Sequence, residues 1–132
     1  SEAEFNESLA FVRSMNFSGG HVFTYSARPG TAAARMKGQV RHEARRERNA
    51  ILQAVFEEMA LAYRQCFVGQ TLPVLWESTS RYGENGLMVE GLTDNYLRVR
   101  AYATEPRWNQ VDTVCLTGLQ DDGMTGKLIN TV

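Results

Sequence analysis

The sequence predicts an α+β chain, in which a helix, a strand and a long helix precede a small five-stranded β-barrel. Two observations predict this class. Apolar residues recur with a helical period between residues 41 and 68, and from Gly69 onward the period changes to two. Glycine commonly ends a helix because it adopts the left-handed conformation without a steric cost. We therefore expect two domains, residues 1–68 and residues 69–132.

The first 25 residues have the pattern of a helix followed by a strand. Ser1 and Glu4 have the spacing of a capping box, and apolar residues follow at helical intervals, so residues 2 to 15 are expected to form an amphipathic helix. The segment His21 to Tyr25 is short and rich in β-forming side chains, so it is expected to be a strand. A single strand needs neighbours to pair its backbone, so this segment has the character of a piece of a larger sheet.

The second domain is expected to contain five short strands. Segments of alternating or β-rich sequence span residues 71–77, 87–93, 96–102, 111–117 and 126–132. Turn-forming residues such as Asp121-Asp122-Gly123 separate them. We expect this antiparallel sheet to close into an OB-like barrel, because closure removes exposed strand edges.

Charge is divided unevenly along the chain. Residues 1–67 carry a net charge of +2 and residues 68–132 carry −3, while the stretch from residue 28 to residue 48 alone carries +5. A polyanion would meet this basic stretch first. Three of its arginines continue the face of the long helix, namely Arg41, Arg45 and Arg48. The alternative for this face is an ordinary solvated helix start.

Alternation along residues 96–102 places an aromatic and basic row on the outside of the barrel. Leu97, Val99 and Ala101 are expected to point inward, because successive side chains of a strand take opposite faces. The outward residues are then Tyr96, Arg98, Arg100 and Tyr102. Tyrosine rings stack on unpaired bases and arginines hold phosphates. The alternative is a solvated strand face, which the net negative charge of this half favours.

The exit of the first predicted strand joins an aromatic ring, a hydroxyl and a guanidinium in Tyr25, Ser26 and Arg28. Loops at the ends of barrel strands often carry enzyme sites, and a guanidinium can grip a carboxylate or phosphate with two hydrogen bonds. These residues are therefore substrate-pocket candidates. The alternative is that Ser26 and Thr31 cap a short turn and that Arg28 faces solvent.

The sequence offers no metal site and no membrane segment. Cys66 and Cys115 have no partner cysteine two to four residues away, so we expect two buried thiols and no bound metal. No run of about 18 apolar residues occurs, which excludes a predicted transmembrane helix. The first residues also lack the order of a secretory signal, so the cytoplasm is the expected compartment.

Two motifs together resemble one family. Residues His21 to Met36, then Gln39-Val40 and Glu47-Arg48, resemble the end of the radical S-adenosylmethionine barrel of the methylthiotransferases. The segment Gly91 to Val99 resembles the signature of their C-terminal TRAM domain. Thr24 stands where the family often has proline. The resemblance covers nearly the whole chain.

The resemblance implies the tRNA-binding C-terminal region of an enzyme that methylthiolates an adenosine next to the tRNA anticodon. The family's complete enzyme uses S-adenosylmethionine and two 4Fe-4S clusters, and its cluster motif CxxxCxxC is absent from this chain. We therefore expect these 132 residues alone to bind neither cofactor and to be inactive. The implied partner is the anticodon arm of tRNA. The residues expected to contact it are Asn95, Tyr96, Arg98, Arg100, Arg41, Arg45 and Arg48.

Two features of the resemblance indicate which substrate the family member modifies. Arg28 resembles the tRNA enzymes more than relatives that act on a ribosomal protein, and Asn95-Tyr96 resembles the threonylcarbamoyladenosine subgroup more than the isopentenyladenosine subgroup. The alternatives are a ribosomal-protein methylthiotransferase and a non-enzymatic TRAM-type module for RNA binding or protein interaction. The resemblance also implies that the first 40 residues here lack their neighbours in the radical S-adenosylmethionine barrel. Their apolar face, around Phe5, Leu9 and Phe23, is therefore expected to be disordered, displaced or covered by a second copy of the chain.

Overall fold

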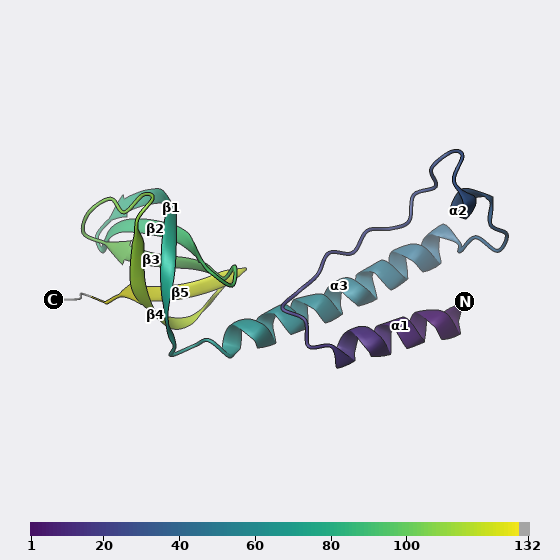
Figure 1. The fold of residues 1–132 in the computed structure, drawn as a ribbon, viewed down its shortest axis with the longest axis horizontal. Coiled ribbons are helices and arrows are strands. Elements are labelled where there is room, and N and C mark those ends of the chain that lie inside the picture. Colours follow the sequence, from purple (N-terminus) through teal and green to yellow (C-terminus); the bar gives the residue numbers. More distant parts are fainter. Residues whose placement is uncertain (130–132) are drawn as a thin grey trace. The chain divides into compact units, whose positions relative to one another are not determined.

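The computed structural model describes residues 1–129 and confirms the α+β class. The chain divides into two compact units, Ser1–Tyr63 and Arg64–Val132. Figure 1 shows helices first and strands after them. The elements are α1 (Glu2–Ser14), α2 (Ala32–Arg35), α3 (His42–Gln65), β1 (Thr71–Gly83), β2 (Gly86–Thr93), β3 (Arg98–Ala103), β4 (Val111–Gln120) and β5 (Gly123–Leu128).

The start of α1 is fixed by the predicted capping box. The Ser1 hydroxyl accepts the backbone N–H of Glu4, and the Glu4 carboxylate accepts hydrogen bonds from the Ser1 hydroxyl and amino group. These hydrogen bonds satisfy donors that no helical carbonyl can reach. The helix buries none of its residues completely, and its apolar face contributes only half-buried side chains such as Phe5 and Leu9.

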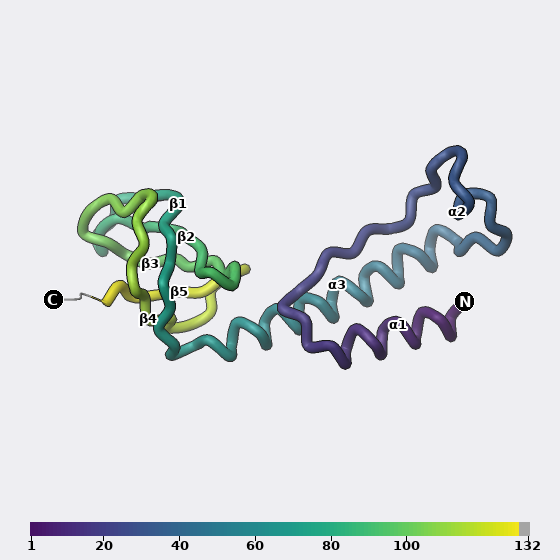
Figure 2. Tube along the Cα trace, in the orientation of Figure 1, coloured from purple at the N-terminus to yellow at the C-terminus, as the bar shows by residue number. Residues whose placement is uncertain are grey.

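The predicted strand at residues 21–25 is wrong. All of residues 1–70 are described, and they contain no strand. The segment instead runs as irregular chain beside α3, as Figure 2 shows. Side chains of α3 satisfy two of its carbonyl groups, since Asn49 Nδ2 donates to Val22 O at 3.3 Å and Arg45 Nη1 donates to Tyr25 O at 3.1 Å. A β-strand pairs its backbone with a neighbouring strand, whereas the neighbour of this segment is the helix α3.

The long helix is confirmed, but its unit has little core. In α3 only Val55 is buried. Several large apolar side chains of the same unit stay exposed, with Phe11 at 60% and Phe23 at 86% of their full accessibility. This unit therefore leaves several large apolar side chains exposed to solvent.

The second unit is a closed barrel with the strand order β1-β2-β3-β5-β4. Four of its five seams are antiparallel, as predicted, but β3 and β5 run parallel through the pairs Val99↔Met124 and Arg100↔Thr125. A ring with an odd number of strands cannot alternate direction throughout, so one parallel seam is required. This topology is that of an OB-like barrel.

Strand lengths differ from the prediction. β1 continues to Gly83 rather than ending at Glu77, and its pairing with β2 shifts register twice, between Trp76 and Ser78 and between Thr79 and Arg81. Such bulges bend a strand, which lets one strand pair with β4 at its start and with β2 along its end. The same shifts interrupt the period of two on which the prediction depended. Toward the turn that they share, β4 and β5 each extend three residues beyond the predicted segments. Residues 130–132 of the predicted last strand lie outside the described residues.

The barrel encloses a continuous apolar core. One glycine is required for this packing. A Cβ on Gly126 would overlap Val114 Cγ1 and would lie 2.9 Å from Val99 Cγ1. The absence of a side chain therefore lets β5 pass closely over both valines. The buried apolar residues are Val74, Trp76, Val89, Leu97, Val99, Ala101, Ala103, Val114, Leu116 and Met124.

Candidate nucleic-acid interface

The turn between β2 and β3 presents Tyr96 to solvent. Thr93 O accepts the N–H of Tyr96 at 3.1 Å, and Thr93 Oγ1 accepts the N–H of Leu97 at 2.9 Å. The Thr93 hydroxyl also donates to Asn95 Oδ1 at 2.6 Å. These bonds hold Tyr96 at φ +62°, a conformation that a bulky residue rarely adopts, with its side chain 84% exposed.

The predicted alternation along β3 is confirmed. Leu97, Val99 and Ala101 are buried, whereas Tyr102 is 54% exposed. Tyr96 lies one turn before the strand rather than in it, because β3 begins at Arg98. The sequence therefore identified the outward row correctly, but the turn geometry, not strand alternation, exposes Tyr96.

A carboxylate on β2 holds both arginines of the row. Glu90 lies opposite Arg100 in the register, and its Oε2 accepts from Arg100 Nε at 3.0 Å while its Oε1 accepts from Arg98 Nη1 at 2.7 Å. The hydrogen bonds from Arg100 and Arg98 lower the pKa of Glu90, and Glu90 is the main cause of a raised pKa at Arg100. Glu90 thereby fixes the direction of two guanidinium groups on one surface.

The turn between β4 and β5 adds two more carboxylates beside Arg100. Asp121 Oδ2 lies 3.5 Å from Arg100 Nη1, and Asp122 Oδ1 lies 3.5 Å from Arg100 Nη2. Both aspartates are largely exposed. Alternation within β3 could not find these partners, because they come from elements that are distant in sequence. The net charge of −3 over residues 68–132 was the only sequence signal for them.

The three predicted helix arginines lie in the first unit and have different surroundings. Arg48 Cζ lies 5.2 Å from the centre of the Phe5 ring, a cation–π distance, and Arg45 donates to Tyr25 O. Arg41 is exposed. Two of the three therefore take part in packing α1 and the adjacent chain against α3.

The substrate-pocket candidates lie on an exposed segment of the same unit. Tyr25 is 41% exposed, and Ser26 and Arg28 are also exposed. Thr31 is the N-cap of α2, since its hydroxyl oxygen accepts the N–H of Ala34 at 3.2 Å. The same hydroxyl donates to Arg28 O at 2.8 Å. The capping role considered for Thr31 is thus present in the structure.

Comparison with known proteins identifies the family. The chain is 38% identical over 104 residues to the threonylcarbamoyladenosine tRNA methylthiotransferase of Bacillus subtilis (strain 168), covering 79% of this chain and 23% of that protein. It is 30% identical over 128 residues to the tRNA-2-methylthio-N(6)-dimethylallyladenosine synthases of Salmonella arizonae and Salmonella newport, covering 97% of this chain and 27% of each relative. This chain belongs to the tRNA methylthiotransferase family. It spans about a quarter of the length of these relatives. No family model matches it.

The residues present here do not fit the iron–sulfur sites that the methylthiotransferase family implies. Among residues 1–129, no three or more His, Cys, Asp or Glu side chains gather where they could hold a metal ion. The expected burial of both cysteines is wrong for Cys66, which is exposed, and Cys115 is half-buried. Within the same described range, no helix combines the length and the apolar character needed to cross a bilayer.

One polar cluster in the barrel was not predicted from the sequence. Trp76 Nε1 donates to Asp112 Oδ2 at 2.8 Å, and Arg107 donates to both oxygens of the same carboxylate. The pKa of Asp112 is lowered, first by Arg107 and also by the Trp76 hydrogen bond. Asp112 thus joins the core to the loop between β3 and β4. The alternating sequence pattern around Asp112 did not predict this role.

Proposed function

We propose that this chain is the tRNA-binding C-terminal region of a radical S-adenosylmethionine methylthiotransferase, and that its barrel holds the anticodon arm. The observation that supports this proposal most is Tyr96, a residue that is 84% exposed although its backbone is held at φ +62°. A bulky residue in this conformation costs about 1 to 3 kcal/mol, and such strain is concentrated at functional sites. A large exposed ring at a strained, well-fixed position has the properties of a stacking platform for a base.

The surroundings of Tyr96 support RNA as the ligand. Arg98 and Arg100 follow it on β3, and Glu90 orients both guanidinium groups. Guanidinium groups bind phosphate with paired hydrogen bonds, and an adjacent ring can stack a base of the same strand. Asn95 stabilises the turn that carries the ring. The names of both kinds of relatives describe modification of tRNA.

The proposal extends to the modified nucleoside. The higher identity to the threonylcarbamoyladenosine enzyme, 38% against 30%, supports that adenosine derivative as the substrate. In the first unit, we assign Tyr25, Ser26 and Arg28 to the substrate and Arg41, Arg45 and Arg48 to the RNA backbone. Arg41, which directly precedes α3, is the best placed of these three arginines for this role, because its side chain is exposed.

We assign the methylthiolation reaction to the complete enzyme. S-adenosylmethionine and two 4Fe-4S clusters would be held by residues outside this chain, and the 132 residues by themselves would bind RNA without catalysis. The reaction would take place in the cytoplasm.

An alternative function is supported by one observation. The two arginines of the row are in contact with three carboxylates, those of Glu90, Asp121 and Asp122, so negative charge exceeds positive charge at this surface. A surface of this charge also suits a protein-interaction module that binds no RNA. Binding measurements with RNA distinguish the two functions.

The deciding experiment uses two substitutions at one position. Asparagine adopts the left-handed conformation more readily than tyrosine, so Tyr96→Asn should fold at least as well while lacking the ring. Tyr96→Phe retains the ring. With an anticodon stem-loop as the probe, Tyr96→Asn should lose about 1 to 3 kcal/mol of binding free energy and Tyr96→Phe should lose little. Tyr82→Asn is the matched control, because Tyr82 is 82% exposed. Equal affinities for wild type and Tyr96→Asn contradict the proposal.

A further inference from the structure

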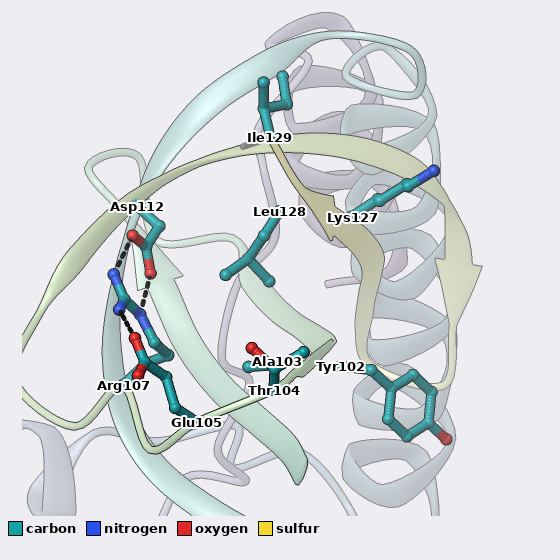
Figure 3. Close-up of a pocket in the computed structure, with 9 residues that line it drawn as sticks. All are labelled: Tyr102, Ala103, Thr104, Glu105, Arg107, Asp112, Lys127, Leu128 and Ile129. Carbon is teal, nitrogen blue, oxygen red and sulfur yellow. Dashed lines mark hydrogen bonds and ion pairs between the residues drawn. The ribbon is translucent and has the colours of Figure 1, made fainter. Parts of the chain in front are cut away.

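The parallel seam of the barrel ends early and leaves a hollow. The pairing of β3 with β5 covers Val99↔Met124 and Arg100↔Thr125. Beyond these pairs, residues of both strands line a hollow of about 520 Å³, shown in Figure 3. This volume lies within the usual range of small-ligand pockets, about 300 to 1,000 Å³. The residues that line it include Tyr102, Thr104, Arg107, Lys127 and Leu128.

The two sides of the hollow differ in their charge balance. On one side, Arg107 is paired with Asp112 and with Glu105, so its charge is neutralised within the protein. Tyr102 and Lys127 stand on the other side in Figure 3. Among residues 1–129, no carboxylate lies within ion-pair distance of the Lys127 ammonium group. Within that range, Lys127 is therefore the cation of the hollow that is available to an anionic ligand.

The strand register explains why Tyr102 and Lys127 share a side. Arg100 pairs with Thr125, so the residues two positions further along each parallel strand lie on the same face of the barrel. Those residues are Tyr102 and Lys127, and both are exposed. Leu128, next in sequence, takes the opposite direction and is half-buried. Tyr102 and Lys127 therefore project outward from the rim of the hollow, whereas Leu128 points into it (Figure 3).

We propose that the outer rim of this hollow is a nucleotide subsite, at which the Tyr102 ring stacks on a base and the Lys127 ammonium group binds the phosphate of the same nucleotide. The proposal rests on the proposed function, because it extends the row of Tyr96, Arg98 and Arg100 along β3. Tyr102 follows Tyr96 by six positions, which corresponds to at most about 20 Å of chain. A single-stranded ligand of several nucleotides could contact both rings, as expected for OB barrels that bind about 4 to 16 nucleotides.

The experiment titrates the full chain with an anticodon stem-loop at several salt concentrations. Tyr102→Ala should weaken binding about 5- to 150-fold if it loses one stacked base, whereas Tyr102→Phe should remain close to wild type. Lys127→Gln should lower the slope of log K against log salt by about 1. In a nuclear magnetic resonance titration, the signals of Tyr102, Thr104 and Lys127 should shift on adding RNA. Tyr82→Ala, an exposed tyrosine that does not line the hollow, should leave affinity unchanged.

The outcomes separate the subsite from the proposed function. If wild type and Tyr96→Asn bind the stem-loop equally weakly, the proposed function fails and the subsite fails with it. If Tyr96→Asn weakens binding but Tyr102→Ala and Lys127→Gln leave both affinity and salt slope unchanged, only the subsite is overturned. Thermal unfolding of each variant identifies any loss that comes from misfolding, and retained binding by Tyr102→Phe shows that the ring is the group required.

Discussion

The indole N–H of Trp76 donates to the carboxylate of Asp112 at 2.8 Å, and Trp76 itself is 1% exposed. A buried donor that loses its acceptor costs about 1 to 3 kcal/mol. We therefore expect Asp112→Ala to lower the free energy of unfolding of the barrel by about that amount. Urea unfolding followed by tryptophan fluorescence measures the change. Asp94→Ala, at an exposed turn residue, is the control and should be nearly neutral.

The same carboxylate predicts a dependence of stability on pH. Arg107 and Trp76 lower the pKa of Asp112 below its ordinary value of 3.8. Its contribution to stability is therefore complete above the unfolded-state pKa and is lost as pH falls through the folded-state pKa. As pH falls from neutral into this acidic range, wild type should lose more unfolding free energy than Asp112→Asn. Identical losses in both proteins would show that the Asp112 interactions contribute nothing to acid sensitivity.

The carboxylates beside Arg100 should weaken RNA binding, because they repel phosphate and occupy the guanidinium group. Exposed ion pairs contribute about 0.2 to 1 kcal/mol, so the double variant Asp121→Asn/Asp122→Asn should bind a stem-loop about 1.4- to 5-fold more tightly. Titration at low salt measures the gain. Glu84→Gln removes one charge at another exposed turn and serves as the control. An equal gain in that control would assign the effect to net charge rather than to Arg100.

Gly126 should tolerate no side chain. A Cβ there would meet Val114 and Val99, which are both fully buried, and overpacking a core typically costs about 1 to 3 kcal/mol. Gly126→Ala should therefore lower the midpoint of thermal unfolding. Gly83→Ala is the comparison, because a Cβ at Gly83 would meet open space, with no atom beyond its chain neighbours within 4 Å. Similar midpoints for the two variants would contradict the packing argument.

The exposed apolar residues of the first unit should promote self-association. Phe11 and Phe23 are 60% and 86% exposed, and this unit buries only Val55 completely. Sedimentation should therefore give a mass that rises with concentration, and Phe11→Ser/Phe23→Ser should reduce that rise. Tyr82→Ser removes an exposed ring from the barrel and should not change it. A strictly monomeric wild type over the whole concentration range would contradict this expectation.

The sequence by itself determined the local elements. The capping box set the start of α1, the helical period set α3, and alternation set which residues of β3 face the core. Each of these features depends on neighbours within a few residues, so the pattern of one segment contains the necessary information.

Only the tertiary structure decided how these elements pair. Residues 21–25 are not a strand because a helix, not another strand, lies beside them, and β1 is lengthened by bulges that adapt it to two partners. The carboxylates around Arg100 come from β2 and from the turn after β4. Cross-strand partners are set by closure of the whole barrel, and no local period records them.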